Sequence, residues 1–333
     1  MKETILLSAK KPQYKANLHC HSTRSDGKKT PEELCALYKG NGYRILAITD
    51  HCNPKDHSAL GSEDFLLLTG YEAYIRPSKS AVYDVFSPEI HLNLFAREPE
   101  NEALICYNPA FVKYVPADRH ASLVRVGSEE PREYTVEYIN RFIRTAREAG
   151  YLVAYNHPVW SMEDEERVMA YEGIFSLELF NTSSRMINRM ESGEALYDKM
   201  LRRGMPVFCH AADDNHNGPH GNDSCGYFTM ISAEELSYPA VIRAMEAGDM
   251  YASNGPRIEK IALCEDEDGK RWVHVETSPA AEVYLHVGSK APAFKKEEGT
   301  SFDLPLHPNA SYFRVAVYDK EGKVANSRGY YVK

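Results

Sequence analysis

Histidine and carboxylate residues recur along the chain in places where short apolar runs end. In "NLHCHSTRSDG", His19 and His21 lie two residues apart, and Asp26 follows five residues later. Alternate residues of an extended strand point to the same side, so both imidazoles face one place. Five later apolar runs, "AITDH", "LLLTGYE", "EIHLNLF", "VAYNHP" and "VFCHAADDNH", carry His51, Glu72, His91, His157, Asp214 and His216.

Imidazole and carboxylate side chains together suit zinc, manganese or iron, and they suit magnesium or calcium alone less well. Two such cations about 3.5–4 Å apart can hold a hydroxide between them and orient a phosphoryl group for in-line attack. The pair His19 and His21, taken alone, would more often be two surface histidines beside a turn. Their recurrence with carboxylates at six strand ends favours a metal centre. The sequence has no Ser-His-Asp nucleophile elbow, P-loop or dinucleotide glycine pattern.

The elements that must position these residues alternate between helix and strand from about residue 16 to 250. Thr30-Pro31-Glu32-Glu33 is a capping box with proline at the first helical position, and "RILAIT" (44–49) follows as a buried strand. The same unit recurs where a helix ends at Gly150 before the strand "YLVAY" (151–155). Such alternation predicts parallel strands joined by right-handed crossovers, in a closed barrel or an open sheet. In a barrel, the carboxyl ends of the strands carry the active site, which agrees with the expected placement of all nine residues.

The chain changes character in two places. Residues 96–133 contain prolines and few periodic apolar positions, which is typical of a lid, a binding loop or a disordered segment. After about Gly255, short strands with turn residues between them replace the helices. We therefore expect two domains, an α/β domain of residues 1–254 and a small β-sandwich of residues 255–333.

Composition restricts the partners and the cellular setting. The chain has 333 residues, a formal net charge of −9 and seven cysteines. The acidic balance argues against nucleic acid or an anionic membrane surface as a partner, and no run of about 18 apolar residues predicts a membrane span. The cysteines are scattered, so reduced thiols and a cytoplasmic location are the simplest account. A protein exported after removal of a signal peptide would give the same sequence, and the oligomeric state stays open.

The series of motifs resembles the PHP (polymerase and histidinol phosphatase) superfamily. "HCHSTRSDG" looks like its first motif, "ITDH" its second, "GYE" with "IHLNLF" its third, and "NHP" with "DNH" its fourth. The resemblance covers residues 17–253. It implies a distorted (β/α)7 TIM-like barrel that holds two to three divalent transition metals (Zn, Mn or Fe). The small β-sandwich that follows is expected to be immunoglobulin-like.

The motif positions imply a ligand set for each metal. One metal would take His19, His21, Glu72 and Asp214, a second Glu72, His91 and His157, and a third Asp26, His51 and His216. Glu72 would therefore bridge two metals. The sequence departs from the family at "ADDNH", where "SDAH" is more usual. Asp214 is preferred because it keeps the Asp-x-His spacing, and Asp213 stays an alternative.

The resemblance implies a metal-dependent hydrolase, most directly a phosphoesterase. Its substrate would be a small phosphomonoester such as a nucleotide or sugar phosphate, attacked by a hydroxide between two metals. We expect Glu72, Asp214 and His216 to take part in catalysis. Asn181 and Arg185 follow a strand end in "FNTSSR" and are expected to bind the substrate.

Two alternatives stay open beside the phosphoesterase. One is hydrolysis of carboxylic or carbamic esters on the same metals. The other is a catalytically idle surface protein that binds glycan or protein through its β-domain. DNA proofreading is less expected, because no basic groove is apparent in the sequence.

Overall fold

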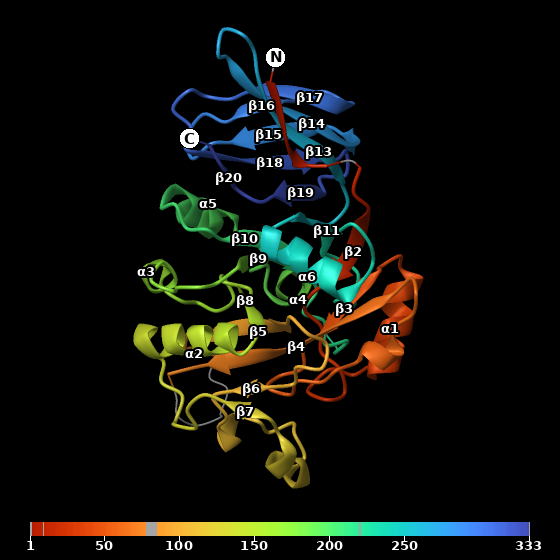
Figure 1. Ribbon diagram of the computed structural model, residues 1–333, viewed down its shortest axis with the longest axis vertical. Helices are drawn as coiled ribbons and strands as arrows, with labels where there is room; N and C mark the ends of the chain where they lie inside the picture. Colours follow the sequence, from red (N-terminus) through yellow and green to blue (C-terminus); the bar gives the residue numbers. More distant parts are fainter. Residues whose placement is uncertain (1, 9, 78–84, 220, 333) are drawn as a thin grey trace.

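The computed structural model describes residues 2–8, 10–77, 85–219 and 221–332, and its fold is mixed α/β, with a large sheet, smaller sheets and few helices (Figure 1). The α-helices are α1 (Pro31–Gly40), α2 (Val136–Glu148), α3 (Glu165–Val168), α4 (Thr182–Ile187), α5 (Glu194–Arg202) and α6 (Tyr238–Ala247). Short 3₁₀ turns cover Ser58–Leu60, Pro109–Phe111 and Ala117–Ser122. Among these helices, none combines the length and apolar character needed to cross a bilayer.

The large sheet carries the candidate site in the half built from strands before residue 213. The strand order in this half is β10-β9-β8-β5-β4-β3-β2. The bounds are β2 (Gln13–Asn17), β3 (Ile45–Ile48), β4 (Leu66–Ile75), β5 (Ile90–Ala96), β8 (Tyr151–Tyr155), β9 (Ser176–Asn181) and β10 (Phe208–Ala212). Beyond β2 the sheet continues through β11 (Phe228–Ser232), β12 (Met250–Ser253), β19 (Val324–Ser327), β18 (Tyr312–Tyr318), β15 (Glu282–His286) and β16 (Ala293–Lys295).

Only some strands of this half-sheet run parallel, as the alternation of helices and strands predicts. β2, β3 and β4 are parallel, and so are β8, β9 and β10. The expectation of parallel strands throughout is wrong for β5, which is antiparallel to both of its neighbours, and for β11 and β12. The sequence between β4 and β5 has a proline near each end and no amphipathic helical pattern. β5 begins beside the end of β4, with Ile90 opposite Ile75, and the two strands pair antiparallel.

The half-sheet curls until its two outermost strands meet at one rim. The chain just after β10 contacts the chain just after β2: Asp214 N donates to His19 O over 2.9 Å, and His21 N donates to Asn215 O over 3.1 Å. Cys20 and Asn215 form an isolated parallel bridge at this point. No continuous ladder joins β10 to β2 in the described part of the chain, so the closed (β/α)7 barrel stays a prediction.

The helices form for the reasons that the sequence indicates. Thr30 caps α1: its Oγ1 accepts a hydrogen bond from Glu33 N, and its own N donates to Glu33 Oε2, which is the predicted capping box. α2 buries the apolar stripe of Ile139, Phe142 and Ile143. α1 lies beside β3 and α2 beside β8 (Figure 1).

The irregular segment 96–133 is packed against the core. It contains the short parallel pair β6 (Leu104–Ile105) and β7 (Arg125–Val126). Phe111 and Val112 are buried in the same apolar cluster as α2. Between its two 3₁₀ turns, this segment brings Lys113 and Tyr114 to the site described below.

The C-terminal part adds a second, four-stranded sheet of order β1-β13-β14-β17. Its strands are β1 (Lys2–Leu7), β13 (Ile258–Glu265), β14 (Arg271–Ala280) and β17 (Gly299–Pro305), and β20 (Tyr330–Tyr331) pairs with β18. Phe302 and Val317, from the two sheets, belong to one apolar core. The N-terminal β1 therefore lies among the C-terminal strands (Figure 1), and β12 pairs with β19 across the boundary predicted near Gly255. The division into residues 1–254 and 255–333 and the immunoglobulin-like topology stay predictions.

Candidate metal centre

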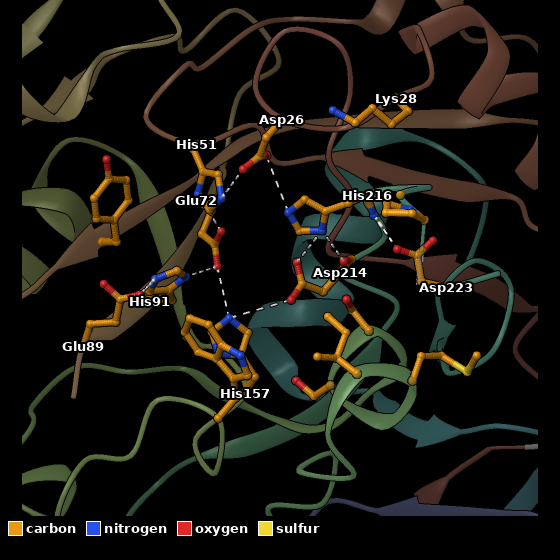
Figure 2. Close-up of a pocket in the computed structure, with 18 of the residues that line it drawn as sticks. Asp26, Lys28, His51, Glu72, Glu89, His91, His157, Asp214, His216 and Asp223 are labelled. Carbon is orange, nitrogen blue, oxygen red and sulfur yellow. Dashed lines mark hydrogen bonds and ion pairs between the residues drawn. The ribbon is translucent and has the colours of Figure 1, made fainter. Parts of the chain in front are cut away.

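The nine predicted ligand residues come together at the rim, around a cavity of about 470 Å³ (Figure 2). Seven of them line the cavity, whereas His19 and His21 are fully buried behind its surface. The premise that each residue lies at a strand end is wrong for Glu72, which lies inside β4, and for His91, which lies near the start of β5. Because β5 is antiparallel, His91 is opposite Tyr74, close to the end of β4, and so reaches the same rim.

His19 and His21 lie at metal-ligand distances from two carboxylates. His19 Nε2 lies 3.2 Å from Glu72 Oε1 and 3.1 Å from Asp214 Oδ1. His21 Nε2 lies 3.2 Å from His19 Nε2 and 3.0 Å from Asp214 Oδ1. Ligand atoms about 2.0–2.1 Å from a cation in tetrahedral geometry are about 3.3 Å from one another. The two histidines thus lie at metal-ligand distances from Asp214 and from Glu72, and these carboxylates belong to different neighbouring groups. The assignment of all four residues to one cation stays a prediction.

Glu72 connects this group to the next one. Its Oε1 lies 3.0 Å from His91 Nδ1 and 3.4 Å from His157 Nε2, and Asn156 Nδ2 donates to the same oxygen over 2.8 Å. Its Oε2 lies 2.9 Å from His51 Nδ1, yet neither atom makes a hydrogen bond. A close approach without hydrogen-bond geometry is expected when two lone pairs point toward a shared cation. Glu72 thus has the position of a bridging ligand.

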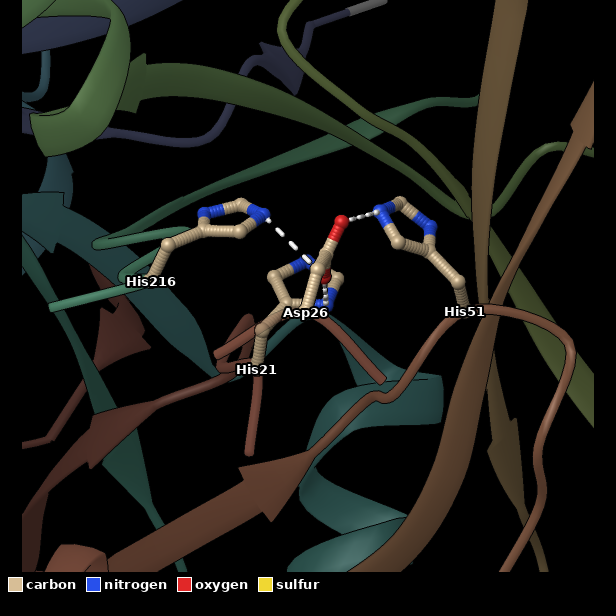
Figure 3. A group of neighbouring side chains, drawn as sticks. All are labelled: His21, Asp26, His51 and His216. Carbon is tan, nitrogen blue, oxygen red and sulfur yellow. Dashed lines mark ion pairs between the residues drawn. The ribbon is translucent and has the colours of Figure 1, made fainter. Parts of the chain in front are cut away.

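A third group surrounds Asp26 (Figure 3). Asp26 Oδ2 lies 3.5 Å from His51 Nε2, and Asp26 Oδ1 lies 3.5 Å from His216 Nε2 and 3.8 Å from His21 Nδ1. The structure adds His21, which was predicted only for the first group, as a fourth member of this one. Tyr114 Oη donates to Asp26 Oδ2 over 3.1 Å. The two ring nitrogens of His21 therefore face two neighbouring groups.

The charges of the cluster suit cations. Burial works against a charge on His21, but the carboxylates of Asp214 and Glu72 outweigh it and raise the pKa of His21 to about 10. Burial favours a neutral Asp26, but the surrounding imidazoles lower its pKa to about 2. Without metal, protonated imidazoles such as His21 thus neutralise the negative charge of the carboxylates. Divalent cations can take the place of these protons. The donor set and its charge fit a divalent-metal centre.

Sequence reasoning missed the residues that hold the ligands in place, above all Glu178. This carboxylate is fully buried in β9. His19 Nδ1 donates to its Oε1 over 3.0 Å, and its Oε2 accepts from His157 N over 2.8 Å. A carboxylate on the far nitrogen fixes the ring orientation of a ligand histidine. The signal was present in "IFSLELF", where a glutamate interrupts an otherwise apolar strand.

The two neighbouring aspartates lie in different surroundings. Asp214 is in the cluster, whereas the side chain of Asp213 accepts hydrogen bonds from Tyr38 Oη over 2.8 Å and from Thr182 Oγ1 over 2.6 Å. Burial raises the pKa of Asp213 to about 6 despite these donors. Asp213 therefore links the chain after β10 to α1 and α4, whereas Asp214 lies in the cluster of candidate ligands.

The two residues expected to bind substrate lie elsewhere. Asn181 is fully buried, and its side-chain amide donates to Asp214 Oδ2 over 3.2 Å, so it supports a ligand rather than facing the cavity. Arg185 is exposed, lies over the ring of Tyr227 and does not line the cavity. Arg185 points away from the cavity because α4 is a short helix that turns successive side chains in different directions. Substrate binding by these two residues stays a prediction. The cations that line the cavity are Lys28, Arg76 and Lys113.

Residues 17–115 match the family model of the PHP domain. The chain contains a PHP domain. The matched segment includes His19, His21, Asp26, His51, Glu72 and His91. The other three members of the cluster come from the chain after residue 115 and join the PHP segment at the rim.

No curated protein matches the chain. Among solved structures, it is similar to a Bacteroides vulgatus protein described as a two-domain protein containing a predicted PHP-like metal-dependent phosphoesterase. The identity is 12%, the TM-score 0.47, and the match covers 100% of this chain and 98% of that one. It is also similar to an amidohydrolase of Chromobacterium violaceum with bound sulfate and no metal, with 16% identity, a TM-score of 0.38, and coverage of 60% and 87%.

Proposed function

We propose that this protein is a metal-dependent hydrolase that cleaves a small phosphomonoester, with two to three divalent transition metals held by the nine clustered residues. The observation that carries the proposal is the convergence of ligand atoms on Glu72 and Asp214 at metal-site spacing. Bound divalent cations would polarise the phosphoryl group and activate water for in-line attack. Zinc, manganese and iron suit the donor set, because it combines imidazole nitrogen with carboxylate oxygen.

The cationic side chains favour a phosphoryl group over a carboxylic or carbamic ester. Lys28 and Lys113 line the same cavity as the ligand residues and are exposed toward solvent. Their ammonium groups can attract the dianion of a phosphomonoester and hold its oxygen atoms. A neutral ester carries no charge for these two ammonium groups to attract, so they would not strengthen its binding.

Other residues of the chain keep the ligands oriented. Arg76 Nε pairs with Glu89 Oε2 at 2.7 Å, and Glu89 Oε1 lies 3.2 Å from His91 Nε2. His91 is thereby held between two carboxylates, with its Nδ1 toward Glu72. Tyr114 orients Asp26, because its hydroxyl donates a hydrogen bond to that carboxylate. These contacts fix the ligand positions before substrate arrives.

We further propose that the half-sheet from β2 to β10 is a distorted (β/α)7 barrel, closed where the chain after β10 meets the chain after β2. We also propose that the two sheets of the C-terminal part form an immunoglobulin-like sandwich. Reduced cysteines in a cytoplasmic protein agree with the seven unpaired thiols of the structure.

The test is an assay of metal-replete protein with manganese and with zinc, on phosphomonoesters, phosphodiesters and carboxylic esters. We expect turnover of phosphomonoesters that stops when a chelator removes the metals. Turnover of carboxylic esters alone would show that the transferred group is acyl. Absence of all turnover in protein shown to hold metals would refute the hydrolase.

A further inference from the structure

The cavity has an apolar wall in addition to its metal-binding wall. Met186 and Ile187, at the end of α4, line the cavity together with Trp160 and Pro219. Met186 and Ile187 are 46% and 54% exposed, although both are large and apolar. Apolar side chains left exposed inside a cavity that also holds convergent polar groups are typical of ligand contact.

The apolar surface begins directly at the candidate ligands. The ring of Trp160 packs edge-on against His91 and His157, with ring centroids 5.2 Å and 4.8 Å apart. Trp160 itself lines the cavity. A group attached to a substrate at the metal centre would therefore meet apolar surface within the same cavity.

The wall is held at a fixed place relative to the metal centre. Asn181 Oδ1 accepts from Ser184 N over 2.8 Å and so caps α4. The amide of the same side chain donates to Asp214. In addition, Ser183 N donates to Asp213 O over 2.9 Å. Helix α4, which carries Met186 and Ile187, is thus tied to the segment that carries a candidate ligand.

We propose that the alcohol released from the phosphomonoester is apolar, with an aromatic ring or a bulky alkyl group that packs on Met186, Ile187 and Trp160. This proposal rests on the proposed function only in placing the cleaved ester bond at the metal centre. A sugar at the same place would lose hydrogen bonds to water, because Met186 and Ile187 offer no donors or acceptors in return. The inference therefore narrows the substrate from any small phosphomonoester to one with an apolar leaving group.

Binding of stable phosphonates to metal-loaded protein tests the wall without any turnover. We expect 2-phenylethylphosphonate to bind at least about tenfold more tightly than methylphosphonate, because the wall buries the ring and its linker. Ile187→Ser should reduce this ratio of dissociation constants about tenfold. The matched control is Ile5→Ser, since Ile5 is 46% exposed on β1 and does not line the cavity; it should leave the ratio unchanged. An equal affinity for the two phosphonates, or an unchanged ratio in folded Ile187→Ser protein, would overturn the inference.

Turnover of four esters separates this inference from the proposed function. The substrates are 2-phenylethyl phosphate, a hexose 6-phosphate, 2-phenylethyl acetate and a 6-O-acetylhexose, all esters of primary alcohols with similar intrinsic reactivity. A kcat/KM at least about tenfold higher for the phenylethyl member of the cleaved pair supports the apolar wall. Preference for the hexose member refutes it. Cleavage of the acetates alone refutes the phosphoesterase, and the preference within that pair still decides about the wall.

Discussion

Replacement of Glu72 by glutamine is expected to dismantle the metal centre. Glu72 Oε1 faces the imidazoles of His91 and His157, and Oε2 lies 2.9 Å from His51 Nδ1. A unit charge about 4 Å from another contributes on the order of 4 kcal/mol at an effective dielectric constant of about 20. The loss of this charge should therefore weaken each of two bound cations by about a thousandfold. Turnover should fall by about a thousandfold or more, because the positively charged environment of the transition state is lost with the metals.

The assay for Glu72→Gln is elemental analysis of the purified variant after dialysis, combined with its phosphomonoester turnover. Glu163→Gln is a matched control, since Glu163 is also a buried carboxylate but accepts its hydrogen bonds from Tyr134 and Tyr155, away from the cluster. The control should lose stability and keep its metal content. A Glu72→Gln protein with the metal content and rate of the wild type would show that the cluster is misassigned.

Three further changes test parts of the same arrangement. Asp26→Asn should weaken the third group alone, so that metal analysis finds a partial loss and a measurable rate remains; complete loss of metal would show that the groups are not separable. Glu178→Gln should lower metal affinity about tenfold to a hundredfold, since it frees the ring of His19, and a competition titration with an unchanged dissociation constant would contradict this. Metal affinity should rise with pH, because burial lowers the pKa of His91 but Glu72 and Glu89 raise it to about 10, so protons must leave when metal binds. Calorimetry of metal binding at pH 7 in buffers of different ionisation enthalpy should therefore detect proton release, and identical heats in all buffers would exclude it.

The sequence was sufficient to predict which residues lie together at the rim, because periodicity and residue type are local properties. Their role as metal ligands stays a prediction. Strands such as Ile45–Ile48 and Tyr151–Tyr155 appear where apolar runs follow helices, and the chemistry lies just after them. The direction of β5 was not predictable in this way, since His91 reaches the rim through a pairing with β4 that depends on the whole connection between them.

The directions in which side chains point were the other property that the sequence did not predict. Arg185 and Ile187 lie on one short helix, yet only Ile187 faces the cavity, and the pattern of six residues does not tell which side is buried. Tyr114 and Lys113 belong to a segment without periodicity, so nothing local predicted that they would reach the site. Pairing of β1 with β13 joins residues more than two hundred positions apart, and only tertiary packing decides it.

The metal content of the wild-type protein tests the central claim most directly. The protein would be loaded with zinc or manganese, freed of excess metal by gel filtration, and analysed for metal per chain. The described residues form four neighbouring groups that share His19, His21, Glu72 and His157, and this arrangement predicts more than one equivalent of transition metal per chain. A content near zero in folded protein would contradict the account.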